Sequence, residues 1–167
     1  YRKIRNTFRY LLGNLNDNFE ELNFEDLEPN NLPELEQLML HKIYTLNNNF
    51  IKYFKNYDFH NLYKELLNFC TVDLSAFYFD IRKDTLYCDS KNSNRRKSTL
   101  ILLNIILNSL LRWFAPILSF TTEEIYQLVS KRKKSIHLEN FLRFPRNFEN
   151  VKLDDKWTKL IKIRDAC

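Results

Sequence analysis

The chain has very little glycine, with a single one among 167 residues, and only four prolines. Tight hairpins and bulged strands depend on these residues, so their scarcity argues against a sheet of many strands. Hydrophobic residues make up 44% of the chain and aromatic residues 15%, which is enough for a buried core. We therefore expect an all-α fold, a helical bundle of about five to six helices, with residues 1–167 forming a single domain.

The chain is also poor in the side chains that most often carry out catalysis or bind metals. Its cysteines and histidines stand far apart, with no CxxC pair, no HExxH pair and no glycine-rich phosphate loop. These residues are Cys70, Cys88, Cys167, His41, His60 and His137. We expect reduced thiols in a cytoplasmic protein and assign no catalytic, cofactor-binding or metal-binding residue.

Long hydrophobic runs are missing as well. The longest, from Leu100 to Leu111, is interrupted by Asn104, Asn108 and Ser109 and is too short to span a bilayer. No signal peptide is recognisable, so neither secretion nor a membrane is expected. The net charge of +5 is compatible with a phosphate-rich partner but does not identify one.

Hydrophobic periodicity places most of the chain in helices joined by a few polar loops. Pro33 and Asp58 are expected at helix starts, and Ser93 or Asn94 at another. The expected helices cover residues 1–13, 33–56, 59–71, 73–87 with a kink near 72–75, 94–114, a segment after Pro116, and 154–167. Residues 14–32 read as a polar connection, and 132–150 as an extended segment. Residues 1–130 would form the core bundle and 131–167 an extended segment with a truncated helix. Neither end carries a helix cap, so we expect the chain to be cut from a longer protein.

The stretch from Leu111 to Ile125 ends one helix and starts the next. Pro116 lacks a backbone donor and disfavours helical geometry in the residue before it, so a helix should end near Phe114. Thr121 and Glu124 have the spacing of a capping box for the following helix.

The first helix has one hydrophobic stripe, made of Ile4, Phe8, Leu11 and Leu15, which should be buried. The rest of its surface carries Lys3, Asn6 and Tyr10 in one row and Arg2, Arg5 and Arg9 in a second row. Unpaired RNA bases stack on aromatic rings and hydrogen-bond to amides, while cations neutralise the phosphates. This surface is therefore a candidate RNA-binding face. The alternative is a solvated helix face whose tyrosine is covered by another element.

Other basic clusters have less specific explanations. Arg95, Arg96 and Lys97 fall in the first turn of a helix, where they oppose the helix dipole, so a phosphate contact and salt bridges remain equal alternatives. Lys131 to Lys134 suit the end of a helix. Arg82 and Lys83 are expected to pair with Asp80 and Asp84. Both tryptophans, Trp113 and Trp157, are assigned to packing.

Several separated stretches resemble class I isoleucyl-tRNA synthetases. These are residues 1–15, 57–60, 69–70, 73–87 and 112–121, in the order the family has them. The Tyr-Phe-Asp-Ile run beginning at Tyr78, followed by Lys83-Asp84 and Leu86-Tyr87, favours the isoleucine enzyme over its valine, leucine, methionine and cysteine relatives. The resemblance covers most of residues 1–130.

The resemblance implies the helical anticodon-binding domain of that family, which holds the anticodon stem and loop of tRNA(Ile) while a catalytic domain of the same chain performs the chemistry. This piece alone would then not be an enzyme and would bind no cofactor. ATP and Mg²⁺ would belong to the full-length isoleucine–tRNA ligase, expected to be a monomer, and zinc is not expected here.

In the related valine enzyme an asparagine and an aromatic residue of the first bundle helix touch anticodon bases. The matching positions here are Asn6 and Tyr10, with Lys3 one turn earlier; the family more often has Phe at the position of Tyr10. The predicted RNA-binding residues are Arg2, Lys3, Asn6, Arg9, Tyr10, Arg95 and Arg96. Two alternatives stay open: a helical scaffold or protein-interaction module without RNA specificity, and the equivalent domain of a valyl-, leucyl- or methionyl-tRNA synthetase.

Overall fold

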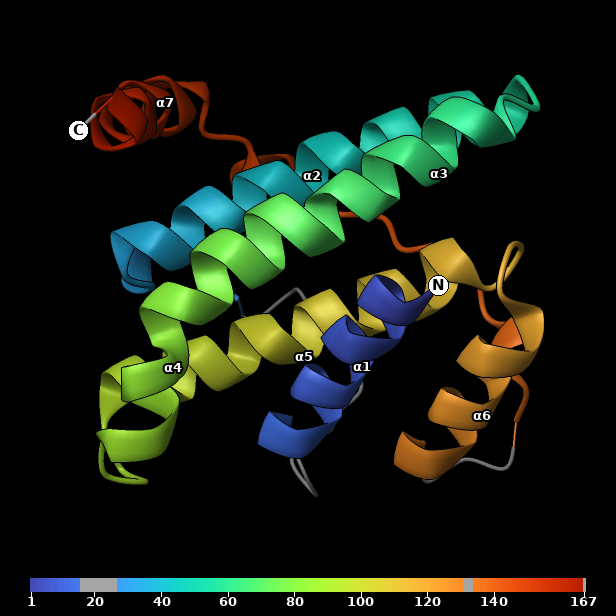
Figure 1. Ribbon diagram of the computed structural model, residues 1–167, viewed down its shortest axis with the longest axis horizontal. Helices are drawn as coiled ribbons and strands as arrows, with labels where there is room; N and C mark the ends of the chain where they lie inside the picture. The colour runs from blue at the N-terminus through green and yellow to red at the C-terminus, as the bar shows by residue number, and fades with distance from the viewer. Residues whose placement is uncertain (16–26, 131–133, 167) are drawn as a thin grey trace.

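The computed structural model describes residues 1–15, 27–130 and 134–166, and within them it contains helices and connecting segments but no β-strand (Figure 1). The prediction of an all-α bundle is confirmed. The α-helices are α1 (Arg2–Leu15), α2 (Glu34–Lys55), α3 (Phe59–Asn68), α4 (Phe79–Cys88), α5 (Asn94–Phe114), α6 (Ser119–Val129) and α7 (Val151–Ala166). A π-helical segment, η3 (Phe69–Tyr78), joins α3 to α4, and short 3₁₀ turns are η2 (Pro29–Asn31), η4 (Ile136–Leu138) and η5 (Arg146–Phe148).

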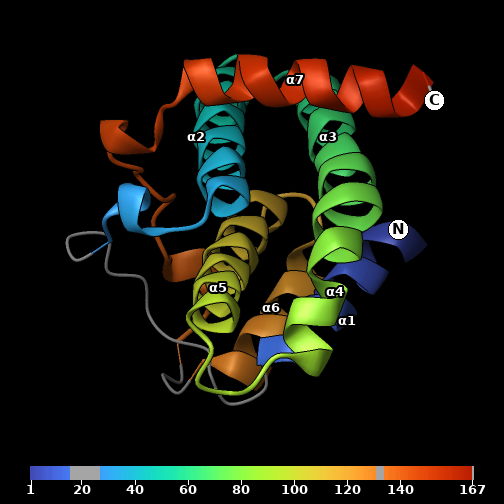
Figure 2. The same ribbon diagram turned by 90° about the vertical axis from the view of Figure 1, so that its left-hand side faces the viewer.

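The helices pack in two layers. The long helices α2 and α3 lie side by side, and α5 runs beneath them with α1 crossing its middle (Figure 1). Figure 2 shows α7 lying across α2 and α3. The amino terminus lies near α6, where the Tyr1 hydroxyl is 3.2 Å from Thr121 Oγ1.

The core confirms the predicted stripe of α1, because Ile4, Phe8, Leu11 and Leu15 are each at most 1% exposed. Both tryptophans pack as expected. Trp113 is fully buried and its indole N–H donates to Asn47 Oδ1 at 3.0 Å. Trp157 of α7 is half-buried with its ring edge-on to Phe77.

The turn between α2 and α3 follows the sequence closely. Asp58 caps α3 as predicted, since its carboxylate accepts a hydrogen bond from the Asn61 amide. Tyr57, just before it, has a φ of 56°, the left-handed conformation that often ends a helix and that usually favours glycine. A tyrosine in this conformation carries some backbone strain at the turn between α2 and α3.

The kink predicted near residues 72–75 takes the form of a π-helical segment, after which α4 turns away from the axis of α3 (Figure 1). Residues 59–88 run as one unbroken helix, and the middle of it is π-helical, so that the Phe79 amide bonds to the carbonyl of Leu74. A π-helical stretch widens the helix without breaking its hydrogen bonding, and this local change of geometry leaves no simple trace in hydrophobic periodicity.

The corner at Pro116 is partly as predicted. α5 ends at Phe114, but α6 begins at Ser119, so Thr121 already lies inside the helix and the capping box with Glu124 is wrong. The residue at the N-cap position is Leu118, whose carbonyl accepts from the Thr122 amide and hydroxyl. The helix therefore begins three residues earlier than an N-cap at Thr121 would give.

Two further boundaries can be compared. Ser93 is at the N-cap position of α5, as predicted, but its hydroxyl donates to Asp89 instead of capping the helix. The described residues between 134 and 150 form two 3₁₀ turns and otherwise extended connections. Parts of the predicted connection 14–32 and of the cluster at 131–134 fall on residues 16–26 and 131–133, outside the described residues, as does Cys167.

Candidate nucleic-acid interface

The exposed face of α1 is the most basic helix surface that the sequence predicts, and the structure leaves it open. Arg2, Lys3, Asn6 and Arg9 are all exposed, because the stripe centred on Phe8 turns the opposite side of the helix to solvent. Residues 1–15 contain no carboxylate, so no acidic side chain within α1 neutralises these cations. The arrangement can contact phosphates along one helix face.

Tyr10 differs from its neighbours on α1. It lies at the border of the buried stripe, half-buried, and its ring stacks on Phe79 of α4 with centroids 4.1 Å apart and an angle of 19°. Its hydroxyl oxygen is buried and has no hydrogen-bond partner among the described residues. Burial, with a smaller contribution from nearby Tyr87, raises the pKa of Tyr10 to about 12. One face of the ring is thus already occupied by the α1–α4 contact.

Arg95 and Arg96 lie in the first turn of α5, as predicted, beside the last turn of α4. Arg95 is exposed, while Arg96 is half-buried and donates from Nη1 to the Asp89 carbonyl at 2.9 Å. The structure does not place them beside Arg2 and Lys3. They lie at the edge of the bundle shared by the carboxyl ends of α1 and α4, the lower edge in Figure 1.

The comparisons with known proteins agree with each other. The family model for the anticodon-binding domain of tRNA ligase matches residues 36–166. The chain belongs to this family.

Relatives of the anticodon-binding domain extend the match to α1. The isoleucine–tRNA ligase of Pelagibacter ubique is 70% identical over the whole chain. Those of Agrobacterium fabrum and Brachyspira hyodysenteriae are 42% and 40% identical over 98% and 99% of it. The chain spans 18%, 16% and 18% of the length of these three ligases.

The described part of this anticodon-binding domain holds no cluster of three or more potential metal ligands. Cys70 is buried, which raises the pKa of its thiol to about 12, and Cys88 is an exposed free thiol. His41 is buried and its Nδ1 accepts a hydrogen bond from the Asn150 amide, a structural role that ties the segment before α7 to α2. None of the described helices has the length and hydrophobicity needed to cross a lipid bilayer.

One polar group of the anticodon-binding domain was missed by sequence reasoning. Arg82, expected to pair with Asp80 and Asp84, instead points into the core and binds Glu36 of α2 through Nε and Nη2. Tyr78 and Thr99 donate to the same carboxylate, at 3.1 and 3.3 Å. Lys83 does pair with Asp80, at 2.9 Å. The network joins α2, η3, α4 and α5, and so fixes the helix on which Tyr10 rests. A glutamate on the hydrophobic face of a predicted helix was the available signal.

Proposed function

We propose that this chain is the anticodon-binding domain of an isoleucine–tRNA ligase and that it binds the anticodon stem and loop of tRNA(Ile). The observation that carries the proposal is the 70% identity to the Pelagibacter ubique isoleucine–tRNA ligase along all 167 residues. Identity at this level throughout a domain favours the same partner, and isoleucine over the valine, leucine and methionine alternatives.

The exposed face of α1 supports a contact with the phosphate backbone. Arg2, Lys3 and Arg9 supply charge without specificity, while the Asn6 amide can both donate to and accept from a base edge. Tyr10 can offer no more than the ring face that Phe79 leaves free. We therefore assign Asn6 to base recognition and the three cations to positioning, with Arg95 and Arg96 as additional phosphate contacts.

The chemistry of the full-length ligase would take place elsewhere in its chain. In this proposal a catalytic domain outside the 167 residues uses ATP and Mg²⁺ to activate isoleucine, and the present domain contributes binding and orientation only. We place the ligase in the cytoplasm, as a monomer, with no cofactor and no zinc held by this domain.

Filter binding tests the proposal. The chain is titrated with a tRNA(Ile) transcript and with the same transcript carrying a swapped anticodon, at several salt concentrations. We expect tighter binding of the native anticodon; equal binding of both transcripts would favour a scaffold without RNA specificity.

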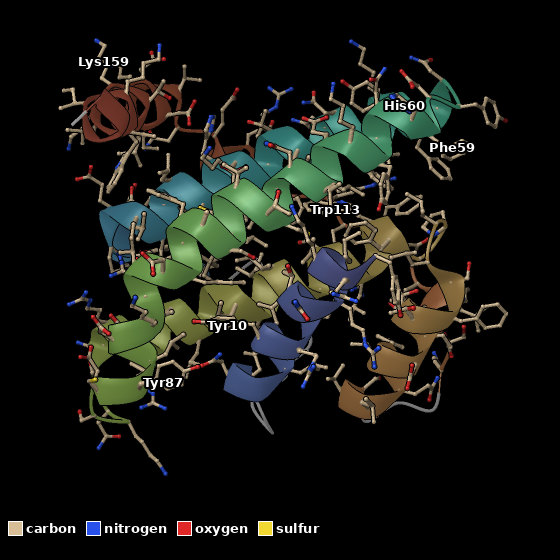
Figure 3. All side chains as sticks on the ribbon, viewed as in Figure 1. Tyr10, Phe59, His60, Tyr87, Trp113 and Lys159 are labelled. Carbon is tan, nitrogen blue, oxygen red and sulfur yellow. The ribbon has the colours of Figure 1, made fainter. Side chains whose placement is uncertain are left out.

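Two variants assign the roles on α1. Arg2→Ala should weaken binding of both transcripts alike and lower the salt slope by about 1. Asn6→Ala should reduce the preference between them and leave the slope unchanged. Lys159→Ala is the matched control, because this exposed lysine lies on α7, away from α1 (Figure 3).

A further inference from the structure

Tyr87 is an exposed aromatic side chain at the carboxyl end of α4. It lies in the last turn of α4 with 68% of its surface exposed, whereas Phe79, two turns earlier, is 6% exposed. Figure 3 shows Tyr87 and Tyr10 close to each other on the side where α4 faces α1. The effect of Tyr87 on the pKa of Tyr10 likewise makes them neighbours.

The aromatic rings at this edge therefore run from the core to the solvent. Phe79 is buried, Tyr10 stacks on it and is half-buried, and Tyr87 stands outside them. Within the described residues no aromatic ring packs on Tyr87, and 68% of its surface is exposed. Among these rings it is the one best placed to receive a flat ligand from solution.

The segment that follows Tyr87 is basic. Four cations and one carboxylate lie between Asp89 and Lys97. Lys91, Arg95 and Lys97 are exposed and have no ion-pair partner among the described residues, and the half-buried Arg96 donates from Nη1 to the Asp89 carbonyl. That bond ties the first turn of α5 to Asp89, two residues after Tyr87.

Three carboxylates of the described residues lie on α4 and in the loop after it: Asp80, Asp84 and Asp89. Asp80 is paired with Lys83, and Asp84 adds a further favourable interaction with the same lysine. Asp89 accepts a hydrogen bond from the Ser93 hydroxyl. Residues 91–97, which follow these carboxylates, carry four cations and no carboxylate. An exposed ring beside such a basic segment is a combination that suits unpaired nucleotides.

We propose that Tyr87 is a base-stacking residue for the bound tRNA, which places an unpaired nucleotide on its ring while Lys91, Arg95 and Lys97 contact the adjoining phosphates. This inference rests on the proposed tRNA-binding function and adds a second contact region, at the carboxyl end of α4, to the face of α1. RNA binding by one domain through two such regions would fix the orientation of the anticodon loop as well as its affinity.

The test uses the full-length ligase with tRNA(Ile), and compares Tyr87→Ala, Tyr87→Leu and Tyr87→Phe. Loss of a stacked base should raise Kd by about 5- to 150-fold in the Ala and Leu variants, and Phe should retain wild-type affinity because it keeps the ring. An unchanged unfolding midpoint would show that the fold is intact, as expected for a side chain this exposed. Equal affinity of all four proteins would overturn the proposal.

A second measurement tests the cations. The combined variant Lys91→Ala, Arg95→Ala and Lys97→Ala should lower the salt slope by about 3. The matched control replaces three of the four exposed lysines of α7, Lys152, Lys159 and Lys162, and should leave the slope unchanged. If the wild-type ligase fails to bind tRNA(Ile), the proposed function itself is wrong; if it binds and neither set of variants differs from it, only the role of this edge is wrong. If this edge binds an acidic protein instead of RNA, the ligase will bind tRNA(Ile) and neither set of variants will change that binding.

Discussion

Removing the carboxylate of Glu36 should destabilise this domain more than removing any exposed charge. Glu36 is fully buried and accepts hydrogen bonds from Arg82, Tyr78 and Thr99. The Glu36→Ala variant leaves Arg82, whose side chain is only 7% exposed, without its counter-charge in the core. Breaking such a pair from one side costs about 3–5 kcal/mol. The free energy of unfolding of a domain is only about 5–15 kcal/mol, so the loss is a large part of the total.

Urea unfolding of the 167-residue chain, followed by far-UV circular dichroism, measures this loss. With an m-value of about 2 kcal/mol/M, the midpoint should fall by about 1.5–2.5 M. The matched control is Asp80→Ala, which removes the exposed partner of Lys83 in the same helix and should cost less than about 1 kcal/mol.

A double variant separates the contribution of the two charges to the free energy of unfolding from the contribution of packing. Replacing Glu36 with Leu and Arg82 with Met removes both charges and fills most of the space, so much of the stability should return. Recovery should be incomplete because the Tyr78 and Thr99 hydroxyls lose their acceptor. A midpoint shift for Glu36→Ala as small as that of Asp80→Ala would refute the reasoning.

Two further predictions concern the contacts of α1 and α7. Tyr10→Phe should leave the free energy of unfolding unchanged or raise it by up to about 1 kcal/mol, because it removes a buried hydroxyl without a described partner, whereas Tyr10→Ala should cost about 2–4 kcal/mol by losing the stack on Phe79. In urea unfolding, a Phe variant as unstable as the Ala variant would contradict this. The hydrogen bond from Lys156 lowers the pKa of Glu34 below its usual 4.5, so its contribution to docking α7 is present above that pH and is lost as the pH falls through the lowered pKa. The NMR signal of the Trp157 indole N–H, which donates to Glu34, should therefore shift below pH 4.5, and the shift should be absent in Glu34→Gln.

The features that could be predicted from the sequence depend on interactions between residues a few positions apart. The stripe through Phe8, the Asp58 cap and the end of α5 before Pro116 all follow from local spacing and backbone chemistry. The predicted start of α6 is wrong because the turn after Pro116, in which the Leu118 amide bonds to the Phe114 carbonyl, leads directly into the helix at Ser119. Thr121 therefore lies inside the first turn and does not cap it.

The features that could not be predicted depend on contacts between distant helices. A helical wheel places Tyr10 at the border of the buried stripe, but only the position of Phe79, 69 residues later in the numbering, decides that its ring is covered. Arg82 has acidic neighbours in sequence, yet it pairs with Glu36 from α2. The exposed face of α1 was identified correctly as basic, while the role of each residue in binding RNA stays a prediction.

The π-helical segment makes the number of residues between α3 and α4 matter as much as their identity. Deleting one residue from Phe69–Tyr78 would change the rotation accumulated across the segment, and each α-helical residue accounts for about 100° of such rotation. Arg82 would then turn away from Glu36, and Phe79 away from Tyr10. We therefore expect insertions and deletions to be tolerated far less in this segment than substitutions, because its length sets the angular phase between the two halves of the helix.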